Sequence, residues 1–277
     1  DLRGIETHGV SNKMADYVRM YTSNEINPRP EWRIVRESPG TAVIDGDTAV
    51  IDATDLTTRK INLELKRIVY DEGVNEVTIV NPGSKHSLGV GILKRCKLTF
   101  EGSPGWYACG LIDGPEVQIN GRVGWALGEN MMSGSIVVEG PSGSLTGAAL
   151  RGGDLVIKGN VGARTGIDQK GGTIITMGSA GISTGFMMQR GHQIICGDAN
   201  DGLGDSMYDG FIYVGGKIAS LGVDCVPAEM TDEDHEFINR KFAIYDLGTP
   251  PDFNKFECGK VLHNYDALEP SERKLVL

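Results

Sequence analysis

The chain has 277 residues, 39 of them glycine, which is about twice the usual share of that residue. Its formal net charge of −10 argues for solubility and against a groove that binds nucleic acid. The sequence holds no run of 18 apolar residues, so no transmembrane helix and no membrane partner are predicted.

Residues 1–47 differ in style from the rest of the chain. The first residues, DLRGIETHGV, are polar and charged and lack the pattern of a secretory signal peptide, which favours a cytoplasmic protein. A helix is predicted next from residues at helical spacing, namely Met14, Tyr17, Val18 and Tyr21. The segment Asn27-Pro-Arg-Pro30 ends this helix, and residues 32–36 (WRIVR) predict a strand.

This segment resembles the N-terminus of the malate/L-lactate dehydrogenase family that lacks a Rossmann fold. The motifs that carry the resemblance are D-L-R-G-x-x-T-H-G-V, I-N-P-R-P and R-I-V-R-E-x-P. The resemblance implies that His8 matches a proposed acid/base of that family, whereas Asn12 stands where many members carry an arginine. The family's nicotinamide-binding region has no counterpart downstream, so we interpret His8 as a solvent-facing residue. A gene fusion, a rearrangement and an assembly error in the sequence are all compatible with this segment.

The predicted domain boundary falls near residues 47–50, where TAVIDGD is followed by TAVIDAT. It separates a fragment, 1–47, from a domain spanning 48–265 and a tail, 266–277. Residues 55–72 predict a helix that Asp55 or Thr57 caps and that Gly73 follows. The apolar stripe of this helix consists of Ile61, Leu65, Ile68 and Val69. Residues 76–80 predict a strand in the first rung of a solenoid, because Gly83 lies 19 residues before Gly102.

From residue 102 to residue 216 the sequence repeats every 19 residues without insertion or deletion, in the pattern G-x-x-G-x3-G-x5-G. A fixed period of this length is the mark of a solenoid. The first glycine column is Gly102, Gly121, Gly140, Gly159, Gly178, Gly197 and Gly216. The second is Gly124, Gly143, Gly162 and Gly181, and the third is Gly128, Gly147, Gly166, Gly185 and Gly204. The fourth is Gly134, Gly153, Gly172, Gly191 and Gly210.

The repeat predicts a short strand and a corner in every period. Runs such as Leu155-Val-Ile157 precede the first-column glycines, and their first and third residues are mostly apolar, so one face points inward. Smaller buried residues are expected after the glycines, at Val123, Ser142, Val161, Ala180, Ala199 and Ile218. Glycine permits a corner through positive φ or close backbone approach, so Gly159→Val is expected to cost about 2 kcal/mol if φ is positive there.

These patterns predict an all-β fold: a right-handed parallel β-helix of 19-residue rungs with short capping helices and an N-terminal α-helical fragment. Roughly seven rungs are expected. A helical interpretation fails because frequent glycines would each cost about 1 kcal/mol in a helix. A collagen interpretation fails because glycine does not occupy every third position.

Residues 50–265 resemble the GXGXG domain that ends the large subunit of glutamate synthase. The motifs are N-P-G-x-x-H-x-L-G-V-G, F-E-G-x-x-G, G-x-N-M-M-S-G, G-D-A-N-x-x-L-G-D-S-M-Y and I-Y-V-G-G-x-I-A-S-L-G-x-D. Because an N-terminal cysteine nucleophile and an FMN barrel are missing, the chain looks most like a stand-alone subunit of the N-methylglutamate synthase or glutamate synthase type. The resemblance implies a structural, non-catalytic role in glutamate biosynthesis and nitrogen metabolism.

The same resemblance implies the partners and the cofactors. An FMN-containing synthase subunit and a glutaminase-type amidotransferase subunit would supply the chemistry, and FMN and iron–sulfur groups would reside in the partner, with none in this chain. Two alternatives stay open: an oxidoreductase of the malate/L-lactate dehydrogenase family, from residues 1–47, and a scaffold like a formylmethanofuran dehydrogenase subunit, which also carries this domain.

Beyond the repeat, Leu221-Gly-Val-Asp-Cys225 is expected to close the last rung, and residues 230–243 predict a helix that caps the far end. Thr231 is its expected N-cap, with Asp234 as the acidic partner in a capping box. Residues 260–265 then look partly strand-like.

Three possible ligand sites were weighed against structural roles. The glycine-rich segment 197–206 resembles a phosphate cradle, but its glycines follow the repeat and its aspartates would repel phosphate. Asp198, Asp201 and Asp205 resemble a calcium site, but the other repeats lack matching acids. The segment Glu129-Asn-Met-Met132 fits a partner contact, although loop and core roles are favoured.

The remaining candidates are also interpreted as structural. His86 is expected to bond to its own turn, and His192 to be exposed at the start of a strand. Arg151, Arg164 and Arg190 are expected to project from successive corners toward an acidic partner. The cysteines, Cys96, Cys109, Cys196, Cys225 and Cys258, are expected to be reduced thiols. No catalytic, cofactor-binding or metal-binding residue is predicted.

Overall fold

The computed structural model describes residues 40–259. The chain divides into two compact units, Asp1–Glu37 and Ser38–Leu277. The helix and strand predicted before residue 37, His8, Asn12 and the segment 260–277 lie outside the described residues.

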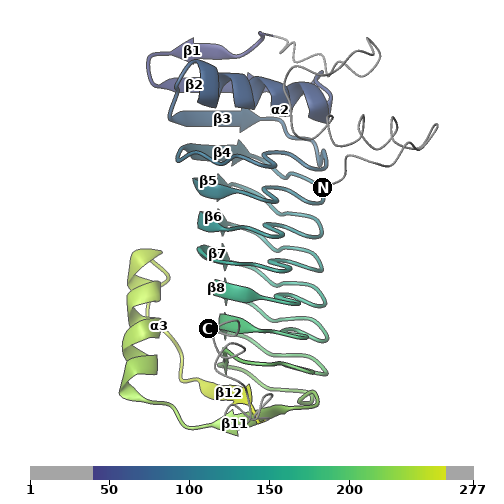
Figure 1. Cartoon of the computed structure of the whole chain (residues 1–277), viewed down its shortest axis with the longest axis vertical. Coiled ribbons are helices and arrows are strands. Elements are labelled where there is room, and N and C mark those ends of the chain that lie inside the picture. The colour runs from purple at the N-terminus through teal and green to yellow at the C-terminus, as the bar shows by residue number, and fades with distance from the viewer. Residues whose placement is uncertain (1–39, 260–277) are drawn as a thin grey trace, which may run out of the picture. The chain divides into compact units, whose positions relative to one another are not determined.

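The described residues form a parallel β-solenoid, in which the strands of successive rungs build one twelve-stranded sheet. Figure 1 shows these rungs stacked one above another. In chain order the strands are β1 (Val43–Asp45), β2 (Thr48–Asp52), β3 (Glu76–Val80), β4 (Lys97–Glu101), β5 (Asp113–Ile119), β6 (Ser133–Val138), β7 (Asp154–Ile157), β8 (Lys170–Thr176), β9 (Arg190–Ile195), β10 (Phe211–Val214), β11 (Cys225–Ala228) and β12 (Asn254–Cys258). The predicted all-β solenoid is therefore confirmed.

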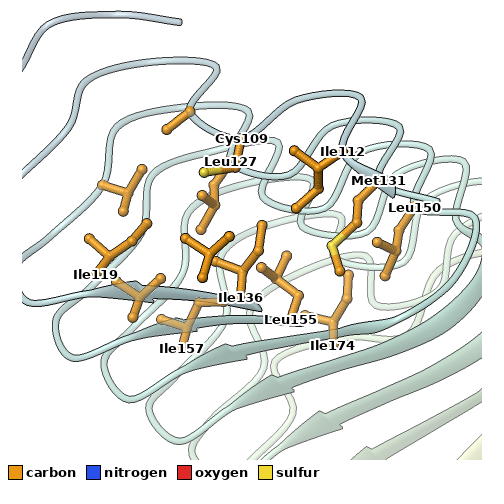
Figure 2. Packing of buried hydrophobic residues seen from close by; sticks show 14 of the residues in the cluster. Cys109, Ile112, Ile119, Leu127, Met131, Ile136, Leu150, Leu155, Ile157 and Ile174 are labelled. Atoms are coloured by element: carbon orange, nitrogen blue, oxygen red, sulfur yellow. The ribbon is translucent and has the colours of Figure 1, made fainter. Parts of the chain in front are cut away.

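The 19-residue period sets the register of strands β4 to β10. Glu116 pairs with Ser135, Ser135 with Asp154, and Asp154 with Thr173, each partner one period further along the chain. All of these neighbours are parallel. The inward columns meet across the interior: Figure 2 shows Met131 and Leu150 facing Leu155 and Ile174.

The solenoid begins earlier than the glycine spacing predicts. Strand β2 already pairs in parallel with β3, and β1 adds an antiparallel strand at the edge. Strand β3 does belong to the first rungs, but Glu76 pairs with Lys97, a step of 21 residues, so the 19-residue step from Gly83 to Gly102 is not kept by the strands. The predicted boundary at residues 47–48 falls in the turn between β1 and β2.

The predicted helix caps this end, with shorter bounds. Helix α2 runs over Thr58–Lys66 and continues as the π-helical segment η2, Arg67–Asp71. Its N-cap is Thr57, whose hydroxyl accepts the N–H of Lys60, and not Asp55. The predicted stripe is fully buried, at Ile61, Leu65, Ile68 and Val69. The charged residue Glu64 is also buried, and accepts the backbone N–H groups of Gly40 and Ala42 and a bond from Arg67.

The glycine columns serve two different purposes. At Gly159 φ is not positive, and a Cβ atom would lie 2.7 Å from the Pro141 nitrogen of the rung above. Glycine is needed there for close approach, so the positive φ considered for Gly159 is wrong. In the third and fourth columns φ is positive, which favours glycine, as at Gly128 and Gly134, where φ is +63° and +98°.

The far end of the solenoid is closed by strands and not by a helix. Strand β12 returns to pair antiparallel with β10, and β11 then pairs antiparallel with β12. The predicted helix exists as α3, Asp232–Ile244, with the predicted capping box of Thr231 and Asp234. It does not cap the end, because it packs against the outer side of strands β7 to β10 (Figure 1).

Removing residues 1–37 is expected to leave the solenoid folded, with an unchanged urea midpoint, because solenoid rungs depend on their neighbours. Removing residues 1–47 also deletes β1 and the two backbone donors to buried Glu64. We expect this longer deletion to cost about 2 kcal/mol. Urea unfolding of both truncated chains measures the difference, and equal midpoints would contradict the role given to Gly40 and Ala42.

Candidate functional site

The outer side of the sheet changes character along the stack. In the upper rungs, those of strands β3, β4 and β5, the outward-facing residue in the middle of the strand is polar and partly exposed: Thr78, Thr99 and Gln118. In the lower rungs it holds Val137, Val156, Ile175, Ile194 and Tyr213. Helix α3 lies against this apolar strip and buries Ile238 and Phe242 on it. We name this arrangement the α3 face, made of Val156, Ile175, Ile194, Tyr213, Ile238 and Phe242.

One end of α3 is anchored by a buried carboxylate. Asp234 accepts hydrogen bonds from the Lys255 ammonium and the Tyr213 hydroxyl, each at 2.7 Å, and completes the capping box with Thr231. Both charged side chains of the pair are 8% exposed. Burial raises the pKa of the Asp234 carboxyl, but the bonds from Lys255, Tyr213 and Thr231 outweigh it and lower the pKa to about 2. The carboxylate thus ties α3 to strands β10 and β12.

The other end of α3 is anchored by a second set of the same residue types. Asp154 of strand β7 accepts bonds from Lys241 at 2.6 and 2.7 Å and from the Tyr245 hydroxyl at 2.7 Å. Burial and the bond to Asp154 raise the pKa of Tyr245, so its phenol stays protonated. The helix is therefore held at both ends, and its position on the rungs is fixed by charge as well as by apolar contact.

His192 lies beneath α3, and the prediction that it is exposed is wrong. Its ring contacts Phe237 of the helix at a centroid distance of 4.2 Å and stacks on Tyr213 at 6.3 Å. Burial lowers the pKa of His192, and the positive charge of Lys241 lowers it further. The sequence could have indicated this cover, because the lower strands are apolar at successive positions instead of alternating.

The Asp234 carboxylate makes the free energy of unfolding depend on pH in the acidic range. The carboxyl has a folded-state pKa of about 2, below its ordinary value of 3.8. Its contribution is therefore complete above pH 4 and is lost as the pH falls through about 2. Urea unfolding between pH 5 and pH 2 should show a loss that is smaller in Asp234→Asn by an amount on the order of 2 kcal/mol. Equal pH profiles for the two proteins would contradict the assignment.

His192 makes a separate contribution near neutral pH. Its folded-state pKa lies below the ordinary 6.5, so the unfolded chain binds more protons as the pH falls below that value. We expect the urea midpoint to drop between pH 7 and pH 5.5, and to drop less in His192→Phe, which copies Phe211 of the next rung. His235→Phe, at an exposed position of α3, is the control for exchanging a histidine for a phenylalanine.

The aspartates of segment 197–206 bond to the next rung and are not gathered into a site. Asp198 accepts the N–H of Lys217, Asp201 the hydroxyl of Ser220, and Asp205 the N–H of Val223. Asp198 belongs to a ladder in which short polar side chains accept the N–H group 19 residues later, at Ser103, Asn160, Ser179 and Asp198. The sequence signal that we missed is the short acceptor directly after the first-column glycine.

His86 bonds across rungs and not to its own turn. Its Nδ1 accepts the N–H of Trp106, and its ring stacks on the indole of Trp106, which stacks on Trp125 at 5.2 Å. Both indoles are about half exposed. Trp106 lies between the rings of His86 and Trp125, so the three stacked rings connect successive rungs along one corner of the solenoid. Sequence reasoning did not single out the two tryptophans.

The three arginines do not share one corner. Arg164 has φ of +55° and stands in a different column from Arg151. Lys170 lies one period after Arg151 and stands opposite Arg190 in the strand register, so Arg151, Lys170 and Arg190 form a basic strip on successive rungs. Within this strip the Lys170 ammonium is paired with the Asp168 carboxylate at 2.6 Å. Met131 is buried in the core, whereas Met132 is 38% exposed.

The cysteines lie in or against the core. Burial raises the pKa of Cys109 and of Cys225 to about 12 in each case, so neither thiol is a nucleophile at neutral pH. The Cys258 thiol donates to the Met207 carbonyl oxygen at 3.1 Å. Among the described residues no group of three His, Cys, Asp or Glu side chains could hold a metal ion. No helix in residues 40–259 is long and apolar enough to cross a membrane.

Comparison with known proteins finds short similarities only. No protein-family model matches the chain. An L-sulfolactate dehydrogenase of Methanocaldococcus jannaschii is 47% identical over 47 residues, 17% of this chain and 13% of that protein. Malate dehydrogenases of Pyrococcus horikoshii and Pyrococcus abyssi are 36% identical over 81 residues and 39% over 67 residues, covering 29% and 24% of this chain. The chain spans 13%, 21% and 18% of the length of these relatives.

Proposed function

We propose that the chain is a structural, non-catalytic subunit of a glutamate synthase-like amidotransferase complex, of the N-methylglutamate synthase type. The observation that carries the proposal is the use of the repeated residues. Glycines such as Gly197 and acceptors such as Asp198 serve contacts between rungs, and the motifs that resemble the GXGXG domain include these positions. These contacts build a scaffold on which other subunits would be held.

The partners are those that the resemblance implies, a subunit with FMN and iron–sulfur groups and a glutaminase-type subunit. The basic strip of Arg151, Lys170 and Arg190 supports contact with an acidic surface, because Arg151 and Arg190 are exposed, while Lys170 is already paired with Asp168. Charges at the rim of an interface mainly speed association. We therefore assign this strip to partner docking.

Co-expression with the products of neighbouring genes tests the proposal. We expect the chain to co-purify with an FMN-containing synthase and a glutaminase subunit, and the isolated chain to form no glutamate. Glutamate formation by the isolated chain would refute a non-catalytic role, and a molybdenum or tungsten partner would favour the formylmethanofuran dehydrogenase alternative. Arg151→Glu should slow association with the synthase, while Arg122→Glu, at an exposed position of another corner, should not.

A second candidate is an oxidoreductase of the malate/L-lactate dehydrogenase family. It is favoured by the 47% identity to L-sulfolactate dehydrogenase over 47 residues. It predicts that the full chain binds NADH or NADPH, which a fluorescence titration measures. Absence of binding would remove this candidate, and binding retained by a chain lacking residues 1–37 would place the site in the solenoid.

A further inference from the structure

Two glutamines interrupt the apolar interior of the solenoid in neighbouring rungs. Gln169 follows Met131 and Leu150 in its column, and Gln193 follows Leu155 and Ile174 in the facing column. Figure 2 shows that the earlier members of these columns face each other across the interior. Gln169 is 0% exposed and Gln193 is 1% exposed. Two buried amides therefore stand where the other rungs place hydrocarbon.

The amide of Gln169 has a fixed orientation. Its Nε2 lies within hydrogen-bond distance of the carbonyl oxygens of Gly171, Gly172 and His192, at 3.0, 3.2 and 3.4 Å. Turning the amide over would set its oxygen against these three acceptors. Its Oε1 must therefore point away from them, and within residues 40–259 it accepts no hydrogen bond.

The amide of Gln193 lies beside that of Gln169 and has fewer hydrogen-bond partners. A Cβ atom placed on Gly166 would meet Gln193 Nε2 and, at 3.0 Å, Gln169 Oε1, so the two amide heads are neighbours. Among the described residues no direct bond joins the two amides, and Gln193 Nε2 lies 3.9 Å from the sulfur of Met188. Gln193 Oε1 accepts no hydrogen bond in the described part of the chain.

We propose that Gln169 and Gln193 form an internal binding site for one water molecule between the rungs of β8 and β9. Buried amide oxygens in proteins are nearly always hydrogen-bonded, to the protein or to ordered water. Both unpartnered atoms are acceptors, so the ligand must donate twice, which a water molecule does. A cation is disfavoured, because a buried charge needs a charged partner and the two amides are neutral.

The exchange of Gln193 for isoleucine tests this site by the sign of its effect. Isoleucine is the residue of the same column in both neighbouring rungs, at 174 and 212, so the backbone already accepts it. If the water joins the amides, Gln193→Ile expels it, leaves Gln169 Oε1 unpartnered, and lowers the folding equilibrium constant at least fivefold. In a Gln169→Leu background the same exchange should be neutral or stabilising. A gain in stability in both backgrounds would overturn the proposal.

A high-resolution crystal structure of the unaltered chain gives a second test that does not depend on the folding of variants. Electron density for a water within hydrogen-bond distance of both Oε1 atoms is expected. A direct amide–amide bond with no water between the glutamines would overturn the proposal.

Gln118→Leu, at a partly exposed glutamine of strand β5, is the control for loss of an amide in the substitution experiment. Its effect on the folding equilibrium constant should be the same with Gln169 and in the Gln169→Leu background.

Discussion

Gly159→Ala is expected to destabilise the chain by about 3 kcal/mol, the upper part of the range for overpacking. The added Cβ atom would lie 2.7 Å from the Pro141 nitrogen and 2.9 Å from the Gly140 carbonyl carbon. These are backbone atoms of the preceding rung, so no side-chain rotation relieves the contact and the two rungs must separate. Gly159→Val adds two further methyl groups and is expected to lower the free energy of unfolding by at least as much. Urea unfolding measures both.

Gly46→Ala is the matched control for this loss. Gly46 has φ of +57°, and a Cβ atom there meets nothing within 4 Å. Its replacement therefore reports the cost of a left-handed backbone alone, about 1 kcal/mol. If Gly159→Ala cost no more than Gly46→Ala, close approach between rungs would not be the reason for the first glycine column.

Lys255→Met is expected to cost about 3–5 kcal/mol, because it leaves the Asp234 carboxylate buried without its cation. The pair is joined at 2.7 Å with both side chains 8% exposed. Since Asp234 also caps α3 and binds Tyr213, we expect the loss to appear first at the helix. Hydrogen exchange should then show faster exchange in residues 232–244, and urea unfolding should give the total change.

Lys97→Met supplies the comparison on the surface. The Lys97–Glu76 pair is equally close at 2.8 Å, but its side chains are 63% and 50% exposed. A pair of this kind contributes at most about 1 kcal/mol. Equal losses for the two variants would mean that burial does not decide the strength of the Asp234–Lys255 anchor.

The sequence predicted the solenoid because its repeat is without gaps between residues 102 and 216. The buried positions after the first-column glycines followed directly: Val123, Val161 and Ala199 are buried bridges between rungs, whereas Ile218, in the last rung, is only partly buried. The capping box at Thr231 was also predicted, since it depends on residues three apart. Local patterns and strict repeats can thus be predicted from the sequence, because the interactions that determine them are made by residues that are close together in the chain.

What could not be read depends on contacts between distant segments. Nothing local tells where α3 packs, because Lys241 meets Asp154 at a separation of 87 residues. Several corners carry left-handed residues that are not glycine, such as Leu145 and Ala149, and these give no compositional signal. The apolar outer strip on β7 to β10 was visible in the sequence, and reading it would have indicated a covering element.

The placement of α3 has a consequence for how the chain is made. The polar upper rungs leave the ribosome first and can stack at once, since their outer side needs no cover. The rungs of β7 to β10 emerge with Val156, Ile175 and Ile194 uncovered, and their helix is synthesised only afterwards. We therefore expect the rungs of β7 to β10 to be open to aggregation in the nascent chain until α3 has emerged and packed against them.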